Sequence, residues 1–496
     1  MSKKEKNTQS DIDGVQYRRA KTWQIALAQL NSGAAMCFYM LIGYASYVGN
    51  VGYGVATALV GMIITGTRIF DGITDPLIAL LIDKTNTRFG KLRLFMFGGW
   101  LIETLAVFMM FNWFSDKGHG IVTFILVYML YSIGYTMNNM AGQVIGPVLT
   151  NDPKQRPLVG VWSTIYNYFI PMCISMGITV GILPRYGNQF TAPMLAAACT
   201  FAVTVSFILE LLACIGVSPA DKTENFKGIS TKSNQEEVKI KDMITILKTN
   251  RALQTYIFAA TSDKLAMQTA GQAVVTTMLY GIIIGNMQLS TIVNMAAMLP
   301  SIIFAIYGGR YAGKHGNKES IITWTRLCII TTAILIVFFG VTSSWTVGKV
   351  MPLMIVFFVL TLSTNGCKMC VTTATGAMLA DIIDYELDRS GKYMPGTMTG
   401  VYSFVDKMVS SLGATIATGS VAVIGYTAVM PQPTDNRTPA IFIMALVLTY
   451  GLPILGWICT LAALKFSPLS KEKMVEVQQN IQEKKAQAEA EEESFA

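Results

Sequence analysis

Apolar runs long enough to cross a membrane recur along almost the whole chain, and this repetition limits what the chain can fold into. A spanning helix needs about 20 mostly apolar residues, and such runs follow one another from residue 24 to residue 466. Only 14% of the 496 residues are charged, whereas a soluble domain carries about 25%. A single soluble core cannot bury this much apolar surface, so the sequence predicts an all-α membrane protein.

Twelve runs are long enough to be transmembrane helices, and the longest polar segment divides them six and six. The predicted spans are 24–49, 55–82, 92–114, 121–149, 158–183, 190–218, 253–282, 288–309, 319–342, 349–380, 396–426 and 437–466. The predicted organisation is a cytoplasmic N-terminal segment (1–23), an N-terminal six-helix bundle (24–218), a cytoplasmic central loop (219–252), a C-terminal six-helix bundle (253–466) and a cytoplasmic tail (467–496).

Two short basic loops indicate that the halves are related. Residues 83–91 follow the second predicted span, residues 310–318 follow the eighth, and each loop has glycine close to lysine. Transporters built from repeated halves show internal symmetry of this kind. The alternative is that any cytoplasmic loop is basic and contains glycine.

Lysine and arginine gather in alternate loops, which predicts the orientation in the membrane. Basic residues are concentrated in the N-terminal segment, the even-numbered loops and the central loop. The odd-numbered loops hold only Lys117, Arg185, Lys349 and Arg437. Because cytoplasmic loops are the basic ones, both termini are predicted to face the cytoplasm. The net charge of +8 is then mostly a topology signal, and we expect no nucleic-acid partner.

Two acids inside the second predicted span point to a cation site. A charge placed in the middle of a bilayer costs about 2.5–3.5 kcal/mol on insertion scales. Asp71 and Asp75 are four residues apart, so their carboxylates lie on one helix face. Two close carboxylates repel unless one is protonated or a cation lies between them. The pair therefore predicts a Na⁺ or H⁺ site; the alternative is a structural ion-pair network with Arg68.

Polar side chains from five spans are predicted to share one depth. At about 1.5 Å of helix rise per residue they lie about 15–18 Å from the cytoplasmic ends, near the midplane where transporter binding sites lie. They are Asp71, Asn139, Asp263, Lys368 and Lys407.

The remaining charges in the C-terminal spans leave alternatives open. Lys264 either snorkels toward the membrane surface, pairs with a neighbouring helix or has a functional role. Lys407 follows Asp406, but adjacent residues of a helix point to different sides. An acid on the second span is therefore the better predicted partner for Lys407.

Aromatic side chains in the spans are candidates for stacking on a sugar ring, although each could instead be a packing residue. These candidates are Tyr39, Tyr44, Tyr135, Trp162, Tyr166 and Tyr402.

Three motifs carry a family resemblance. The first runs from Arg68 to Pro76 and continues through 83–91, the second includes Asp381, Asp384, Tyr385, Gly391, Lys392 and Gly396, and the third runs from Ser403 to Lys407. Together and in this order they resemble the glycoside–pentoside–hexuronide:cation symporters, a family of the major facilitator superfamily that includes melibiose permease. The resemblance implies two six-helix bundles of the major facilitator fold in a bacterial inner membrane. It also implies import of a sugar, glycoside or hexuronide with Na⁺ or H⁺.

The resemblance also implies roles for individual residues. The cation-binding residues would be Asp71, Asp75, Thr136 and Asn139, and the substrate or coupling residues would be Arg68, Asn139, Gln143, Tyr39, Trp162, Tyr402, Ser403 and Lys407. In melibiose permease an acid stands in place of Asn139 and a tryptophan in place of Gln143, which argues against melibiose itself as the substrate.

Other functions fit the sequence less well. The main alternative is a transporter of lipid or another amphiphile on the same scaffold. No HExxH or GxSxG-type motif lies in a span, so we do not expect an enzyme, and a sensor would need an output domain for which both tails are short. We expect no cofactor beyond the coupling ion, no metal other than Na⁺ at Asp71 and Asp75, contacts with membrane lipid, and a functional monomer.

Overall fold

The structure is a computed structural model that describes residues 19–67, 70, 78, 92–115, 118–150, 156–221, 247–342, 346–390, 395–481 and 483. Within these residues every regular element is a helix. The chain forms two compact units. Unit 1 comprises Met1–Ala56 and Ile69–Ser233, and unit 2 comprises Thr57–Arg68 and Asn234–Ala496.

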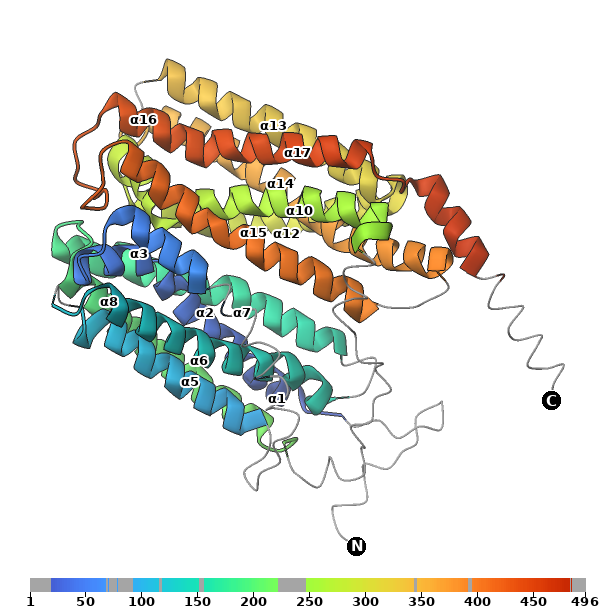
Figure 1. Cartoon of the computed structure of the whole chain (residues 1–496), viewed down its shortest axis with the longest axis horizontal. Helices are drawn as coiled ribbons and strands as arrows, with labels where there is room; N and C mark the ends of the chain where they lie inside the picture. Colours follow the sequence, from blue (N-terminus) through green and yellow to red (C-terminus); the bar gives the residue numbers. More distant parts are fainter. Residues whose placement is uncertain are drawn as a thin grey trace, which may run out of the picture. The chain divides into compact units, whose positions relative to one another are not determined.

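Unit 1 is a bundle of long helices (Figure 1). Several of them continue into wider π-helical turns. Its elements are α1 (Thr22–Ala28), α2 (Leu30–Ile42), α3 (Ala45–Tyr47), η1 (Val48–Gly52), α5 (Leu92–Phe108), η2 (Met109–Trp113), α6 (Gly120–Leu149), α7 (Arg156–Met176), η3 (Gly177–Ile182), η4 (Leu183–Tyr186) and α8 (Ala192–Val217). Helix α5 runs along α6, and α2 packs against α7 and α8.

Unit 2 is also a helical bundle. Its elements are the helix Thr57–Thr67, then α10 (Arg251–Ala270), α11 (Ala273–Thr276), η6 (Thr277–Ile283), α12 (Gln288–His315), α13 (Asn317–Val341), α14 (Met351–Ser390), α15 (Pro395–Val423), α16 (Pro439–Leu446), η8 (Val447–Gly451) and α17 (Leu452–Lys465). Helix α14 packs between α12 and α13, while α10 contacts α15 and α17.

Eight helices of the described part are long and apolar enough to cross a membrane. A ninth is obtained if Ala273–Ile283 and Gln288–Ala297, which meet at 113°, count as one span. The predicted spans at 253–282 and 396–426 are helical, but α10 and α15 do not meet this apolar criterion because charged and polar residues lower their hydropathy. The predicted span 55–82 lies partly outside the described residues, which include only its first helix, Thr57–Thr67.

Local sequence signals explain several helix boundaries. Thr191 and Asn250 precede α8 and α10, and their side chains accept hydrogen bonds from the backbone N–H groups of Met194 and Leu253. Such N-caps satisfy donors that a helix start leaves free. Gly316 separates α12 from α13 with a φ of +93°, a backbone conformation that favours glycine.

Glycines let neighbouring helices approach closely, as expected for helices packed in lipid. A Cβ at Gly134 on α6 would lie 2.5 Å from the Glu103 nitrogen of α5. A Cβ at Gly61 would lie 1.9 Å from Thr418 Oγ1 of α15. In unit 2 the helix Thr57–Thr67 is therefore held against α15, where Thr65 Oγ1 also donates a 2.8 Å hydrogen bond to the Ser411 carbonyl.

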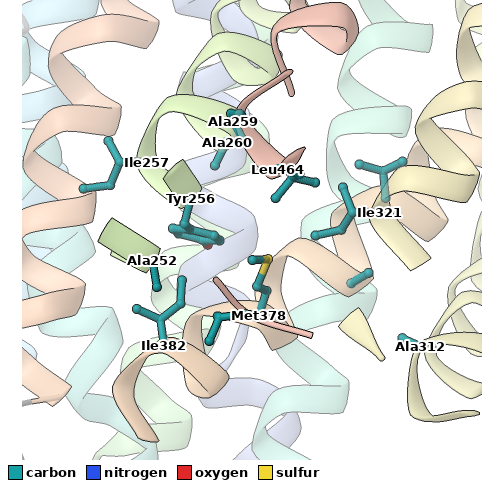
Figure 2. Close-up of a cluster of buried hydrophobic side chains, with 14 of the residues drawn as sticks. Ala252, Tyr256, Ile257, Ala259, Ala260, Ala312, Ile321, Met378, Ile382 and Leu464 are labelled. Atoms are coloured by element: carbon teal, nitrogen blue, oxygen red, sulfur yellow. The ribbon is translucent and has the colours of Figure 1, made fainter. Parts of the chain in front are cut away.

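The core of unit 2 is an apolar cluster contributed mainly by α10, α13, α14 and α17 (Figure 2). Tyr256 lies in its middle, near Met378. The cluster extends to Leu469 at the start of the tail. Residues 471–481 of the tail form a helix with Val477 fully buried, and Gln478 donates a 2.8 Å hydrogen bond to Asp384 on α14.

Candidate functional site

The acids predicted to bind the cation, Asp71 and Asp75, and the neighbouring Arg68 lie outside the described residues. Their predicted helix-four partners are placed on α6. Thr136, Asn139 and Gln143 are spaced by three and four residues, so they lie along one side of that helix. The Thr136 side chain is buried, at 4% exposure, whereas Asn139 is exposed.

Two of the predicted aromatic residues of unit 1 form a stacked pair. The rings of Trp162 and Tyr166 on α7 are 5.7 Å apart between centroids, with an interplanar angle of 29°. Trp162 Nε1 is buried and has no hydrogen-bond partner in the described part of unit 1. An indole N–H is a donor that usually finds a partner when buried, and the described residues of unit 1 supply none for Trp162. Tyr39 on α2 is 40% exposed.

In unit 2 an ion pair joins α10 to α15. Lys264 Nζ binds Asp406 Oδ2. The side chain of Asp406 is 8% exposed and that of Lys264 is 44% exposed. The structure therefore shows Lys264 paired with a neighbouring helix. Asp406 Oδ1 is buried and makes no hydrogen bond to a described residue.

A second charged group lies between α10, α14 and α17. The Asp263 carboxyl lies beside Lys368 and Trp457, and Lys368 Nζ is 5.6 Å from the centroid of the Trp457 ring. A cation over an indole face is attracted by the ring quadrupole. Asp263 Oδ1 is buried without a hydrogen-bond partner among the described residues, so this group retains an acceptor that is not used.

Helix α15 carries the remaining predicted site residues of unit 2. Tyr402 lies one helical turn before Asp406. The centroid of its ring is 5.2 Å from that of Tyr256 on α10. Ser403 is partly buried and Lys407 is exposed. The structure thus gathers Asp263, Lys264, Lys368, Tyr402 and Asp406 at the meeting of α10, α14, α15 and α17.

The sequence prediction missed Tyr256 and Trp457, whose rings also contact this group. Tyr256 lies seven residues before Asp263, which is two helical turns and so the same face of α10; that spacing could have indicated it. Trp457 has no comparable signal, because an aromatic residue in an apolar run is expected for packing alone. Among the described residues no group of three or more His, Cys, Asp or Glu side chains could hold a metal ion.

Comparisons with known proteins agree with this architecture. The model of the family described as MFS/sugar transport protein matches residues 24–471. An isoprimeverose transporter of Lactiplantibacillus pentosus is 23% identical over 84% of this chain and 82% of its own length. A glucuronide carrier protein homologue of Escherichia coli is 23% identical over 92% of this chain and 93% of its own. YagG of Escherichia coli, provisionally named a glycoside/cation symporter, is 23% identical over 80% and 83%.

Solved structures show the same fold at lower identity. A crystal structure of the nucleoside transporter NupG has a TM-score of 0.60 at 13% identity and covers 90% of this chain and 100% of NupG. An inward-facing bacterial homologue of the lysosomal transporter Spinster has a TM-score of 0.61 at 11% identity, covering 92% of this chain and 97% of that chain. At such identities the likeness concerns the fold alone.

Removing the Asp406 charge tests the ion pair between α10 and α15. Asp406→Asn leaves the Lys264 ammonium without its counter-ion, and we expect a loss of about 1–3 kcal/mol of stability, between the values for exposed and buried pairs. Melting temperatures of the protein in detergent measure this loss. Adding Lys264→Gln to Asp406→Asn should recover part of it. Strictly additive losses in the double variant would contradict the pairing, and Glu476→Gln in an exposed pair is the control.

Proposed function

As a member of the MFS/sugar transport protein family, the chain is a multi-pass membrane transporter and not an enzyme, and we propose that it is a symporter that couples sugar import to a cation gradient. The substrate class would be a sugar, glycoside or hexuronide. The observation that carries the proposal is the family match over nearly the whole chain, together with relatives named for glycoside/cation symport, isoprimeverose transport and glucuronide carriage.

The proposed architecture has twelve spans in two six-helix bundles, with both termini in the cytoplasm of a bacterial cell. Eight described helices meet the apolar criterion. Four further spans complete the twelve. One would begin with the helix Thr57–Thr67, and the other three would be formed by α10 with η6, by α12 and by α15. Two of these helices, α10 and α15, contain charged and polar residues of the candidate site, which lower their hydropathy, whereas the described helix Thr57–Thr67 is apolar but short. The alternation of basic loops supports the orientation.

Substrate would bind in unit 1 against the Trp162 and Tyr166 pair. A sugar offers C–H groups that stack on aromatic rings and hydroxyl groups that need hydrogen-bond partners, and ligand sites combine apolar walls with a few polar groups. The unpaired Trp162 Nε1 supplies one donor. Exposed Asn139 supplies both a donor and an acceptor, and Gln143 lies one turn along the same helix.

The coupling cation, Na⁺ or H⁺, would bind at Asp71 and Asp75 with Thr136 and Asn139. The argument rests on the four-residue spacing of two acids inside an apolar span, since their repulsion is relieved by a cation or a proton. Cation binding then removes the repulsion between the two acids and pre-organises the polar groups that bind the substrate. Alternating access follows if the two ligands together favour one state, because a ligand shifts an equilibrium only through its differential affinity for the states.

In unit 2, Lys407 and Ser403 are proposed as coupling residues on α15. Lys264 already neutralises Asp406, so Asp406 does not have to serve its neighbour Lys407. An acid of the second span is the proposed partner of Lys407. The Asp263 and Lys368 group is proposed as a second charged element of the transport pathway, because its acceptor Asp263 Oδ1 is not used within the described residues.

Removing either proposed cation ligand should uncouple transport. We expect Asp71→Asn and Asp75→Asn to abolish uphill uptake of a radiolabelled glycoside in proteoliposomes with an imposed Na⁺ or pH gradient. Facilitated exchange of the same glycoside should persist in part, because the substrate site itself remains. Glu476→Gln, at an exposed tail position, is the control. Gradient-driven accumulation by Asp75→Asn equal to that of the natural protein would refute the assignment.

The aromatic pair gives a separate prediction about the substrate. Trp162→Ala removes a stacking surface and an N–H donor, which together are worth about 1.5–2.5 kcal/mol. We therefore expect glycoside affinity to fall by about tenfold or more, as measured by titration with the purified protein. Trp113→Ala is the matched control, since Trp113 is 58% exposed and lies outside the proposed site. Equal affinities for Trp162→Ala and Trp113→Ala would place the sugar elsewhere.

A further inference from the structure

Unit 1 contains a buried polar cluster that the proposed transport site does not use. Asn31 on α2, Glu103 on α5, Asn138 on α6 and Glu210 on α8 meet there, and none of the four is more than 2% exposed. Asn31 Nδ2 donates to Asn138 Oδ1 and also to Glu210 Oε2, the latter at 3.2 Å. The Glu103 carboxyl lies beside Asn138 and is electrostatically coupled to Glu210.

The cluster holds polar atoms that the described residues do not satisfy. Both carboxyl oxygens of Glu103 and the Nδ2 of Asn138 are buried and have no hydrogen-bond partner there. Buried polar side chains normally have a partner, and an ionised carboxylate without one is especially unfavourable. The buried Glu103 carboxyl group therefore needs either a bound cation or a proton to neutralise its charge.

On the four described helices that form the cluster, no basic side chain pairs with either acid. The helices α2, α5, α6 and α8 carry only three charged residues, namely Arg93, Glu103 and Glu210. Arg93 lies ten residues before Glu103 on α5, about 15 Å along the helix, and its guanidinium binds Asp221 and Ser218. The other ionisable neighbours are thiols: Cys214, whose Sγ is 3.9 Å from Glu210 Oε1, and Cys37 on α2, which is coupled to Glu103.

The packing leaves little room for a hydrated ion. A Cβ at Gly142 would lie 2.4 Å from Asn31 Oδ1, and a Cβ at Gly99 would lie 2.7 Å from the Asn138 nitrogen. Two contacts within the cluster are already amide N–H donations from Asn31, and an N–H group cannot ligate a cation. A proton needs neither space nor further ligands, so it fits this cluster better than Na⁺.

We propose that Glu103 and Glu210 form a proton-binding pair that holds one proton, carried by Glu103, while Glu210 stays ionised. The Asn31 amide favours the charge on Glu210 because it donates to that carboxylate. Two neighbouring carboxyl groups do not both ionise readily in a dry site, so the pair takes one proton from solution, and Glu103 carries it because its oxygens accept no hydrogen bond from the described residues. Losing it would place two negative charges between α5 and α8, which links the packing of these helices to pH.

This site is independent of the proposed sugar symport and can be tested without transport. The full-length protein in lipid nanodiscs is studied by infrared difference spectroscopy at neutral pH. The spectrum of the natural protein minus the spectrum of Glu103→Gln should show the C=O stretch of a protonated carboxylic acid. This band should shift to lower frequency in D₂O. The natural protein minus Glu476→Gln should show only carboxylate bands, because Glu476 is exposed. Carboxylate bands alone in the Glu103→Gln difference would overturn the proposal.

Two further measurements keep the proposal falsifiable if one variant behaves poorly. Glutamine has the size and neutrality of a protonated glutamate, so Glu103→Gln should fold and melt close to the natural protein; failure to fold would indicate an ionised Glu103 and contradict the assignment. In the natural protein alone, raising the pH should convert the acid band into carboxylate bands. Conversion by added Na⁺ at constant pH would assign the pair to sodium and overturn the proton assignment.

Discussion

The free-energy cost of placing charged and polar groups among apolar side chains decides how both units are built. An unpaired charge in such surroundings is so unfavourable that it must pair, lose its charge or bind an ion. The two units meet this requirement in different ways. In unit 2 opposite charges compensate each other, as in the pair of Lys264 with Asp406 and the group of Asp263 with Lys368. In unit 1 the buried acids Glu103 and Glu210 have no basic partner on their own helices.

This difference has a consequence for what each unit can bind. Compensated charges hold helices together while leaving single acceptor atoms, such as Asp263 Oδ1, for a ligand. Uncompensated acids attract a cation or a proton in their own right. Glycine contacts bring α5 and α6 close together. Because closely packed helices exclude water, the free-energy cost of an uncompensated charge between them rises.

The all-helical, multi-pass character could be predicted because the length of an apolar run follows directly from the thickness of the bilayer; the orientation drawn from the basic loops stays a prediction. The family resemblance seen in the motifs is confirmed by the family match. Side-chain direction was harder to predict. Asn138 and Asn139 are adjacent, and the sequence favoured Asn139 alone; the structure has Asn138 fully buried in the acidic cluster and Asn139 exposed. Neighbouring helical residues differ by about 100° in direction, and only the packing of α6 against α5 fixes which one faces inward. For the same reason the partner of Lys264 could not be predicted from the sequence. Pairing between two helices depends on how each is rotated about its own axis.

We propose that a coupling cation bound at Asp71 and Asp75 prepares the protein for its sugar, and the dependence of sugar affinity on the cation tests this most directly. Binding of a panel of glycosides and hexuronides to the purified protein should be titrated at several Na⁺ concentrations and at several pH values. For the transported sugar, we expect Kd to fall by about fivefold to 150-fold when the coupling cation is saturating, the usual range of coupling between two sites. A sugar that binds with the same Kd at every Na⁺ concentration and every pH would contradict it.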